Sequence, residues 1–573
     1  MPNATPFRFR LRSWGGTLIR KRMRSQAGRF LMQTNTCRDT QQDVLHRLLE
    51  LNRGTDFSRD HGLDSVHTVA EFRQRVPVVD YEYHRPYIER LKRGERSALL
   101  GDRNRLLMFT LTSGTTAESK FIPITSQFLA DYRRGWTIWG IRAYDDHPAL
   151  HVQQIVQLTS DHDQFRTAGG TPCGNISGLV SAMQSAVVRT MYTVPGLVSK
   201  IKDPEAKYYT ALRLSVPDRH VGMVTTANPS TLLQLARQAD ANCDDLIRDI
   251  ADGTLSQKFT IDAEIRRKLR TRFRVRNPQR ARELEAIVSD TGHLYPRHYW
   301  SNLSLIAVWT GGSAGAYTSG LRQFYGDVPI RDHGLHASEG RMTIPFEDHT
   351  SSGVLDLTSH FFEFIPDSEY GKADPVVLEA HELEPGRNYF ILLTTASGLY
   401  RYNIHDVVRC TGYRGGTPML EFLNKGSQIS SVTGEKITES QVVSAVKDSL
   451  AATSLQLTHF TVGPAWGDPP GYQLLFEEHE MPAELRARIC EAIDSRLSVL
   501  NCEYGEKRKT GRLGPLSPVA IPTGAWRRFA RRRQSKLGGS IEQYKHPCLV
   551  PDLKFCEDFV REYCEPGTPM SRV

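Results

Sequence analysis

A short stretch of the chain, residues 110–123 (TLTSGTTAESKFIP), gathers residue types that bind phosphate. Hydroxyl side chains, a glycine and Lys120 follow an apolar run at residues 106–111, which is typical of a buried strand. In such a loop, backbone N–H groups and hydroxyls can point at phosphate oxygens while the lysine supplies a point charge. The spacing is not that of a Walker loop, and a Thr/Ser-rich surface turn fits the composition equally well.

Four later segments shift the balance between these two interpretations. In chain order they are residues 334–340 (GLHASEG), 400–409 (YRYNIHDVVR), 431–439 (SVTGEKITE) and 538–547 (GGSIEQYKHP). Together with residues 110–123, this ordered set resembles the signature motifs of the adenylate-forming enzymes, and in particular those of the acyl acid amido synthetases, the GH3 family. The similarity runs from about residue 40 to about residue 560, and the ordered series is far more specific than any one motif.

The resemblance implies an ATP-dependent ligase. Enzymes of this kind adenylate a carboxylic acid with release of pyrophosphate, then transfer the acyl group to an amino acid amine, which yields an amide and AMP. The implied cofactors are ATP and Mg²⁺, and the implied partners are a small carboxylic acid and an amino acid. Because a carboxylate is a poor electrophile, such a protein must neutralise charge on the α-phosphate and shield the mixed anhydride from water.

The resemblance also implies roles for single residues. Lys545 would be catalytic at the carboxylate and α-phosphate oxygens, and Glu339 would be catalytic as the ligand of Mg²⁺. Asp406 would accept hydrogen bonds from the ribose hydroxyls. The residues implied to bind the nucleotide are Ser113, Gly114, Thr115, Thr116, Lys120, Gly311, Gly312, Ser338, Asp406, Lys425 and Lys436.

Structural explanations compete for three of these residues. Glu339 also suits the start of a helix. Asp406 has Arg401 and Arg409 as possible partners on a sheet face, and Lys545 fits a surface cation in a basic tail. The order and spacing of the whole series favour the functional interpretation.

Four positions depart from the family pattern. Ala117 and His405 stand where relatives usually have glycine, which restricts positive φ angles there. Leu335 replaces a common aromatic ring near the adenine. Lys425, in the connector 424–425, replaces a common arginine and loses its planar fork. These departures bear on ATP affinity and rate more than on the fold.

A pattern near the C-terminus, Asn501, Tyr504 and Arg508, resembles the synthetases and is not expected in general acyl-CoA ligases. It therefore favours amide formation over thioester formation. Two alternatives stay open. One is a thioester ligase that uses coenzyme A. The other is a non-catalytic basic relative that binds nucleic acid or has a regulatory role.

The net charge of +9 raises the question of a nucleic-acid partner. Residues 1–38 hold nine Arg or Lys and no acidic residue, and residues 526–533 hold five arginines among aromatic residues. Such patches attract phosphate. A solvated basic face and a poorly ordered N-terminus are the more ordinary explanation, so nucleic acid is not the expected partner.

Size and composition point to a soluble enzyme. The 573 residues predict at least two domains, and 39% hydrophobic and 24% charged residues are ordinary for a globular protein. No apolar stretch approaches the ~20 residues that cross a bilayer. The nine cysteines occur singly, which excludes a C-x-x-C zinc or redox site and fits reduced thiols. We therefore expect a cytoplasmic protein with no membrane partner.

The patterns along the chain predict an α/β fold with layered sheets and helices. Residues 41–52, 230–250 and 263–288 have helical character, and residues 303–310, 389–394 and 407–413 have strand character. We expect a basic N-terminal extension (1–38), a large ATP- and acyl-substrate-binding domain (39–425) and a smaller mobile α+β domain (426–573). In the small domain, residues 458–462 predict a strand and residues 482–500 a helix.

Overall fold

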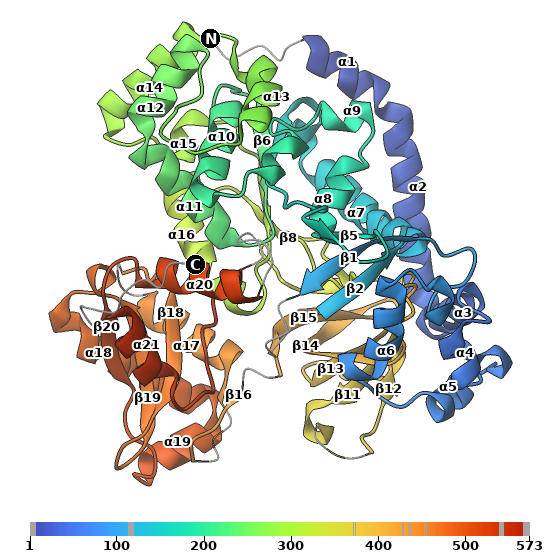
Figure 1. Ribbon diagram of the computed structural model, residues 1–573. Coiled ribbons are helices and arrows are strands. Elements are labelled where there is room, and N and C mark those ends of the chain that lie inside the picture. Colours follow the sequence, from blue (N-terminus) through green and yellow to red (C-terminus); the bar gives the residue numbers. More distant parts are fainter. Residues whose placement is uncertain are drawn as a thin grey trace. The chain divides into compact units, whose positions relative to one another are not determined.

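The structure is a computed structural model that describes residues 7–564 except 113–119, 371, 373, 427–428, 434, 436, 452, 454 and 538–543. Contacts between Cα atoms divide the chain into two compact units (Figure 1). The first unit comprises Met1–Trp309, Leu321–Ile404 and Val408–Glu421, and the second comprises Thr310–Gly320, His405–Val407 and Phe422–Val573. The second unit is therefore assembled from three separate stretches of sequence.

A parallel sheet in the first unit has the strand order β3-β6-β7-β8, and each adjacent pair is parallel. Its strands are β3 (Gln154–Gln157), β6 (Val221–Thr225), β7 (Leu305–Val308) and β8 (Ile330–Asp332). The connections contain α8 (Ile176–Ala182), α9 (Ala186–Arg189), α10 (Pro204–Ser215), α11 (Pro229–Ala241), α12 (Cys243–Asp252), α13 (Ala263–Phe273), α14 (Pro278–Thr291), α15 (Pro296–Tyr299) and α16 (Thr318–Tyr325). The strand expected at residues 303–310 and the helices expected at 230–250 and 263–288 are confirmed, the latter two as helix pairs.

A second sheet of the first unit carries the start of the expected phosphate loop. Its order is β2-β1-β5-β4, with β1 (Leu106–Thr112), β2 (Lys120–Thr125), β4 (Phe165–Arg166) and β5 (Pro172–Gly174). Strand β1 is antiparallel to β2 and parallel to β5. Residues 106–111 thus form the predicted strand, and the loop that follows them, 113–119, lies outside the described residues.

A seven-stranded sheet has the order β12-β11-β13-β14-β15-β10-β9. Its strands are β9 (Thr343–Ile344), β10 (Gly353–Leu355), β11 (Phe361–Pro366), β12 (Leu378–Glu379), β13 (Asn388–Thr394), β14 (Tyr402–Arg414) and β15 (Thr417–Lys425). Strand β11 is buried along almost its whole length because its alternating faces both meet apolar side chains. The strands expected at residues 389–394 and 407–413 are confirmed as β13 and β14.

Six of the described α-helices precede β1 in the sequence, and a seventh follows β2. They are α1 (Phe7–Gly15), α2 (Thr17–Gln33), α3 (Cys37–Leu51), α4 (Asp56–Asp60), α5 (Val69–Arg75), α6 (Tyr81–Lys92) and α7 (Ser126–Asp146). The helix expected at residues 41–52 is α3, whose buried positions include Val44, Leu45 and Leu48. Residues 7–33 are helical where we expected poor order, because Phe9 and Phe30 are buried.

The second unit has an α+β core of its own. Strands β18 (Phe460–Ala465) and β19 (Gly471–Glu477) are antiparallel, and β19 is parallel to β20 (Ser517–Ile521). Two short strands, β16 (Ile429–Ser430) and β17 (Ile437–Thr438), form a separate pair. The helices are α17 (Glu439–Leu450), α18 (Ala483–Leu500), α19 (Cys502–Lys509), α20 (Ala525–Leu537) and α21 (Phe555–Tyr563). The strand expected at 458–462 and the helix expected at 482–500 are confirmed.

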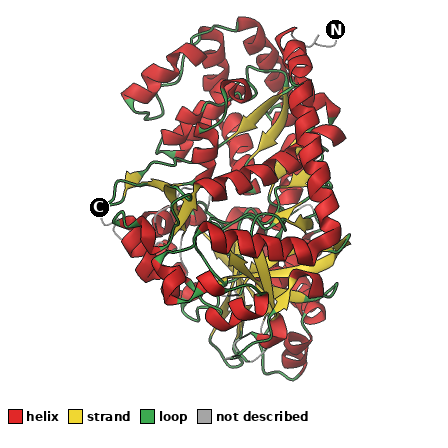
Figure 2. Ribbon diagram, turned by 90° about the vertical axis from the view of Figure 1, so that its right-hand side faces the viewer, coloured by secondary structure: helices red, strands yellow, loops and turns green. Residues whose placement is uncertain are grey.

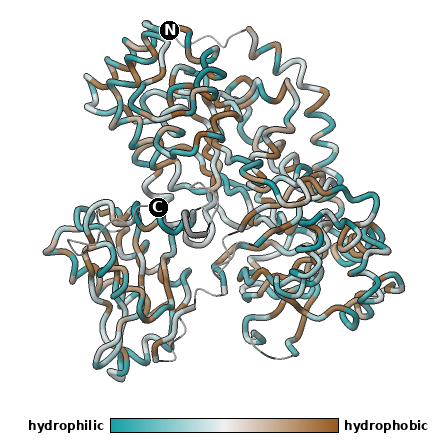
Figure 3. The backbone as a smooth tube through the Cα atoms, viewed as in Figure 1, coloured by the Kyte–Doolittle hydropathy of each residue, from teal (hydrophilic) through white to brown (hydrophobic). Residues whose placement is uncertain are grey.

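Helices and strands alternate along the chain, as an α/β fold requires (Figure 2). Hydrophobic side chains from strands and helices form the core of each unit, and hydrophilic stretches lie between hydrophobic ones along the backbone (Figure 3). The expected α/β class is therefore confirmed. The domain limits 1–38, 39–425 and 426–573 stay a prediction.

Candidate active site

Ser338 and Glu339 lie at the tip of a tight hairpin in the first unit. Ala337 N–H donates to the carbonyl of Gly340 at 2.9 Å, and Gly340 N–H donates back at 3.4 Å. An antiparallel bridge between His336 and Arg341 closes the base. The two residues therefore form a two-residue turn and not a helix start, so the structural explanation offered for Glu339 does not apply.

Gly340 allows this hairpin to pack closely against the seven-stranded sheet. A Cβ atom at residue 340 would lie 2.6 Å from Nε2 of His360, a residue just before β11. Any side chain here would push the turn away from the sheet. The position of Glu339, whose exposed fraction is 7%, is thus fixed by its glycine neighbour.

Aromatic side chains from α7 and from the residue that follows β7 contact the base of the same hairpin. The Trp136 ring meets the His333 and His336 rings at centroid distances of 5.0 and 5.7 Å. The Trp309 ring lies 4.8 Å from His336. The guanidinium of Arg341, fully buried, sits 4.5 Å above the Trp136 ring, and burial lowers its pKa. Trp136, Trp309 and His336 keep partial exposure, so they form a largely aromatic surface at the base of the hairpin that carries Ser338.

Of the residues of the phosphate loop that were expected to bind the nucleotide, the structure describes only Lys120. Lys120 is the first residue of β2, and its ammonium lies 5.6 Å from the centre of the Tyr81 ring. The predictions for Ser113, Gly114, Thr115, Thr116 and the departure at Ala117 fall outside the described residues, as does the prediction for Lys436.

Asp406 and Lys425, both expected at the nucleotide site, meet in the second unit. The Lys425 ammonium donates to Oδ1 of Asp406 at 2.6 Å. The Asp406 side chain is only 4% exposed, whereas that of Lys425 is 45% exposed. The alternative partners of Asp406 bind elsewhere: Arg401 pairs with Glu363 at 2.9 Å, and Arg409 pairs with Glu421 at 3.3 Å.

Gly311 and Gly312 begin a 3₁₀ helix, Gly312–Tyr317, in the second unit. Gly312 has φ +57°, and a Cβ atom there would lie 2.8 Å from the Phe422 ring and 2.9 Å from the carbonyl of Leu423. The glycine is therefore required by the left-handed backbone and by the close approach of β15. This requirement explains Gly312 whether or not adenine contacts the turn.

Lys545 projects from a segment whose other residues are anchored. Val462 N–H donates to the carbonyl of Cys548 at 2.8 Å, and Val550 N–H donates to that of Val462 at 2.9 Å, so the segment runs beside β18. Lys545 itself is exposed while His546 is buried. Its ammonium lies 5.4 Å from the centre of the Phe422 ring. The lysine is thus more than a cation in an unattached basic tail.

Two side chains that the sequence did not single out hold this segment. Glu439, the first residue of α17, accepts a hydrogen bond from Cys548 N–H at 2.7 Å. The Thr461 hydroxyl lies 2.9 Å from Nε2 of His546 and donates to the carbonyl of Pro547 at 2.8 Å. The available sequence signal was the position of Glu439 as the acidic residue in the first turn of α17, directly after Thr438, which forms a capping box with Gln441.

The environment of Glu439 changes its acidity. Burial raises the pKa of Glu439 to about 7, against the opposing effects of the backbone N–H groups of Cys548 and Leu549 and of the Lys545 charge. Burial also lowers the pKa of His546 well below its ordinary value, which keeps that ring neutral. Lys545 is therefore the charged side chain of its segment, beside a carboxyl that titrates near neutrality.

His405 occupies a position where relatives usually have glycine, and its backbone shows why. Its φ angle is +60°, in the left-handed region. Its carbonyl accepts a hydrogen bond from Gly426 N–H at 2.7 Å, which holds the conformation next to Asp406 and Lys425. His405 thus places a residue other than glycine in a left-handed backbone conformation, at a cost in local strain.

The pattern Asn501, Tyr504 and Arg508 forms a buried polar cluster. The Tyr504 hydroxyl donates to Oδ1 of Asp494 at 2.6 Å, and the Arg508 guanidinium donates to Oδ2 at 2.9 Å. The Asn501 side chain caps α19 by accepting from Tyr504 N–H at 2.9 Å. These contacts give the three residues a structural role in the second unit.

The described side chains suit an Mg²⁺ ion that binds together with the phosphates of ATP. Among the side chains that the structure describes, no group of three or more His, Cys, Asp and Glu could hold a metal ion. Glu339 is a single carboxylate, and Mg²⁺ is often bound by one or two carboxylates together with substrate phosphates. The role of Glu339 as a ligand of Mg²⁺ stays a prediction.

Solved structures define the class of fold. The chain matches an acyl acid amido synthetase with a TM-score of 0.81 and 22% identity, covering 94% of this chain and 96% of that one. A structure of such a synthetase in complex with 2,4-DB matches with a TM-score of 0.79 and 22% identity, covering 95% and 96%. This chain thus has the fold of the acyl acid amido synthetases.

The sequence profiles define the family. The GH3 family N-terminal domain matches residues 26–330, the central domain matches residues 353–425 and the C-terminal domain matches residues 440–554. The chain belongs to the GH3 family, as its motif series implied. A jasmonoyl–L-amino acid synthetase of Nicotiana attenuata is 25% identical over 91% of this chain and 93% of its own length. An indole-3-acetic acid-amido synthetase of Arabidopsis thaliana is 25% identical over 92% of each chain.

Proposed function

We propose that this protein is an ATP-dependent ligase that adenylates a carboxylic acid and transfers the acyl group to the amine of an amino acid. The match of all three GH3 domains, in order and over most of the chain, carries this proposal. The named relatives are amido synthetases, which favours an amine over coenzyme A as the second substrate. The site supports it, because Asp406, Lys425 and Lys545 supply the charges that a nucleotide and a carboxylate require.

The chemistry consists of two displacements. A carboxylate oxygen attacks the α-phosphorus of ATP, and the bond to the leaving pyrophosphate breaks. The amine nitrogen of the amino acid then attacks the acyl carbon, AMP leaves with the original carboxylate oxygen, and the nitrogen loses a proton. When bound with ATP, Mg²⁺ would neutralise phosphate charge at Glu339.

Each residue has a part that suits its surroundings. Asp406 is nearly buried and pairs with a lysine that reaches solvent, so ribose hydroxyls can compete for its oxygens. Lys425 can then turn to a phosphate. Lys545 is held on an anchored segment and would stabilise charge on the α-phosphate and the carboxylate during adenylation. Ser338 would donate its hydroxyl to the α-phosphate.

The acyl group would rest on the aromatic surface beside Ser338. Trp136, Trp309 and His336 offer an apolar surface with a few polar atoms, which suits the body of an organic acid. This surface is formed by α7, by the residue that follows β7 and by the hairpin.

The nine cysteines are all free, which supports a reducing compartment, and we propose the cytoplasm as the site of the reaction. Within the described part of the chain, no helix is both long and apolar enough to cross a bilayer.

A screen of carboxylic acids and amino acids tests the proposed function. Purified protein with ATP and Mg²⁺ should release pyrophosphate when an acid is present, and a matching amino acid should accelerate the release and yield an amide. Replacing the amino acids with coenzyme A distinguishes a thioester ligase. Calorimetry with ATP that shows no binding would instead favour a non-catalytic relative.

A further inference from the structure

The outer face of α1 and of the start of α2 carries large apolar side chains that are exposed to solvent. The exposed fractions are 78% for Phe7, 54% for Leu11, 79% for Trp14 and 79% for Leu18. Single exposed apolar residues are common on proteins, but a row of four is not. We call this row the N-terminal stripe.

The stripe follows one side of a nearly continuous helix. Its members are spaced by four, three and four residues, which places them on one helical face. Gly16, between the two helices, keeps right-handed helical dihedrals. Helical hydrogen bonds pass through it, from Gly16 N–H to Arg12 and from Arg20 N–H to Gly16, both at 2.9 Å. The row therefore continues from α1 into α2, which follow one another end to end in Figure 1.

The opposite side of α1 is docked onto the first unit. Phe9 is 2% exposed, and its ring meets His220 edge-on at 5.5 Å. The Arg12 guanidinium donates to the carbonyl of Gln153 at 2.6 Å. These contacts fix the rotation of the helix, so the outward direction of the stripe is a consequence of packing on its other side.

Basic residues flank the stripe. Arg10, Lys21 and Arg22 are exposed beside it. Residues 1–38 hold nine Arg or Lys and no acidic residue, so the region has no charge partner within its own sequence. Arg24, further along α2, reaches Asp145 of α7 at 2.7 Å. The exposed surface thus combines a row of bulky apolar groups with positive charge.

The basic helix α20 shows what a covered surface of similar composition looks like. Its Trp526 is only 2% exposed and packs on Phe559 with ring centroids 4.7 Å apart. Arg528 of the same helix donates to the carbonyl of Tyr563 at 3.1 Å. In α20 the Trp526 ring therefore faces the core, whereas in α1 the Phe7 and Trp14 rings face solvent.

We propose that the N-terminal stripe and its flanking basic residues adsorb to an anionic phospholipid bilayer. An interfacial helix has a Trp, Phe and Leu face beside Lys and Arg, and it lies in the plane of the headgroups. The positive flanks complement anionic headgroups. We expected no membrane partner because no segment can span a bilayer, but surface adsorption needs no such segment.

Other occupants fit the surface less well. A second copy of the same face would bring two clusters of positive charge together without an acidic residue between them. A nucleic acid would find the basic flanks, but its phosphates would meet four apolar side chains at the centre of the face. An anionic bilayer satisfies both the apolar row and the charge.

Sedimentation of the full-length protein with vesicles tests the proposal. Vesicles of phosphatidylcholine mixed with phosphatidylglycerol should bind the protein, and vesicles of phosphatidylcholine alone should bind it much more weakly. The combined change Lys21→Ser and Arg22→Ser should weaken binding about fivefold for each charge removed. Trp14→Ser should weaken it about tenfold.

The matched control removes two arginines from α20. Arg527→Ser with Arg531→Ser lowers the net charge by the same amount and should leave vesicle binding nearly unchanged. Trp14, Lys21 and Arg22 have exposed side chains, so the variants of the stripe and its flanks should melt at the temperature of the unaltered protein. Acid-dependent pyrophosphate release without vesicles should also be unchanged, which separates this proposal from the proposed ligase function.

Three results would overturn the proposal. The first is equal binding to both kinds of vesicle, or binding that Trp14→Ser does not weaken. The second is a dimer in light scattering that Trp14→Ser dissociates, with no vesicle binding. The third is binding to RNA with the same dependence on Lys21 and Arg22 and no vesicle binding.

Discussion

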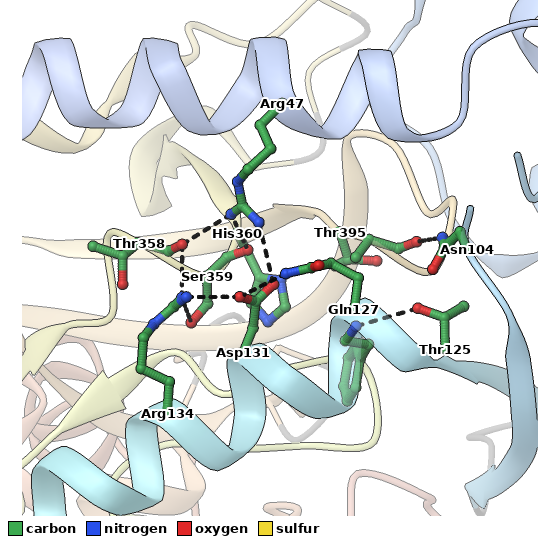
Figure 4. A network of polar contacts seen from close by, with 12 residues as sticks. Arg47, Asn104, Thr125, Gln127, Asp131, Arg134, Thr358, Ser359, His360 and Thr395 are labelled. Atoms are coloured by element: carbon green, nitrogen blue, oxygen red, sulfur yellow. Dashed lines mark hydrogen bonds and ion pairs between the residues drawn. The ribbon is translucent and has the colours of Figure 1, made fainter. Parts of the chain in front are cut away.

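Each unit of the protein holds a buried aspartate that faces cations, and the two aspartates differ in what surrounds them. In the first unit, Asp131 of α7 is fully buried between Arg134 at 2.8 Å and Arg47 at 3.5 Å (Figure 4). Gln127 also donates to it at 3.1 Å. In the second unit, Asp406 pairs with Lys425, whose side chain is 45% exposed.

The comparison separates a structural carboxylate from one that can exchange partners. The arginines around Asp131 also donate to the carbonyl of Thr358, so this network links α3, α7 and the segment before β11 (Figure 4). Burial raises the pKa of Asp131, while the two arginines oppose that shift. A ligand cannot replace such partners without unfolding. The partner of Asp406 reaches solvent, so a ligand can displace it.

Removal of the charge on Lys545 should have the largest effect. Lys545→Ala should slow acid-dependent pyrophosphate release by about 10²–10³-fold, because a donor aimed at charge that develops in the transition state is lost. Lys554→Ala removes another exposed lysine of the second unit and should leave the rate unchanged. An unchanged rate in Lys545→Ala would remove this lysine from the mechanism.

Asp131→Asn should lower the free energy of unfolding by about 2–4 kcal/mol, because Arg47 and Arg134 lose a buried counter-charge. Urea unfolding measures this difference, and the KM for ATP should not change. Asp145→Asn on the same helix breaks only a surface pair with Arg24 and should cost less than about 1 kcal/mol. Equal losses in the two variants would contradict the structural role of Asp131.

Asp406→Asn should weaken ATP binding and leave the free energy of unfolding almost unchanged. It should raise the KM for ATP about 10- to 100-fold, as the loss of a hydrogen bond to a charged group implies, with little change in unfolding. The matched control is Glu421→Gln on β15. It breaks the pair with Arg409 of β14 and should leave the KM for ATP unchanged. A stability loss without a change in KM would make Asp406 a structural residue like Asp131.

Glu439→Gln should change the pH dependence of adenylation. In the unaltered protein the pKa of Glu439 is raised to about 7, so its charge appears as the pH rises through that value. The negative charge of Glu439 then attracts the Lys545 ammonium and helps to hold it in place, and kcat/KM should rise over this range. Tyr317 and Cys548 also face Glu439, but both titrate far above neutral pH because burial raises their pKa values.

Glu439→Gln should remove this rise and lower kcat/KM severalfold above pH 7, with little change below it. It should also remove a stability loss between about pH 5 and 7, since the folded state holds the proton more tightly than the unfolded state. Glu480→Gln alters another buried carboxyl, which accepts from Thr458 N–H, and is the control. If kcat/KM of Glu439→Gln and of the unaltered protein depended on pH in the same way, the proposed coupling between Glu439 and Lys545 would be contradicted.

Local patterns were enough to predict much of the fold. The apolar run before residue 112 and the period of α18 depend only on neighbours in sequence, and both appear where expected. The motif order also predicted that Asp406 and Lys425 belong to one site, and the structure pairs them. The phosphate loop, Lys436 and the domain limits stay predictions.

Long-range contacts were beyond the sequence. The anchoring of Lys545 by Glu439 joins residues more than a hundred positions apart. The N-terminal helix and α20 are similar in composition, because both contain arginines among aromatic residues. Only the packing of Trp526 on Phe559 shows that the aromatic face of α20 is covered. The cluster that Tyr504 and Arg508 form around Asp494 likewise depends on how α18 and α19 meet.

An isotope experiment tests the central claim most directly. An acid that stimulates pyrophosphate release is labelled with ¹⁸O in both carboxylate oxygens and supplied with ATP and the matching amino acid. Attack of the carboxylate on the α-phosphorus predicts one label in AMP and one in the amide carbonyl. AMP without label, or label in inorganic phosphate beside ADP, would contradict an acyl-adenylate intermediate.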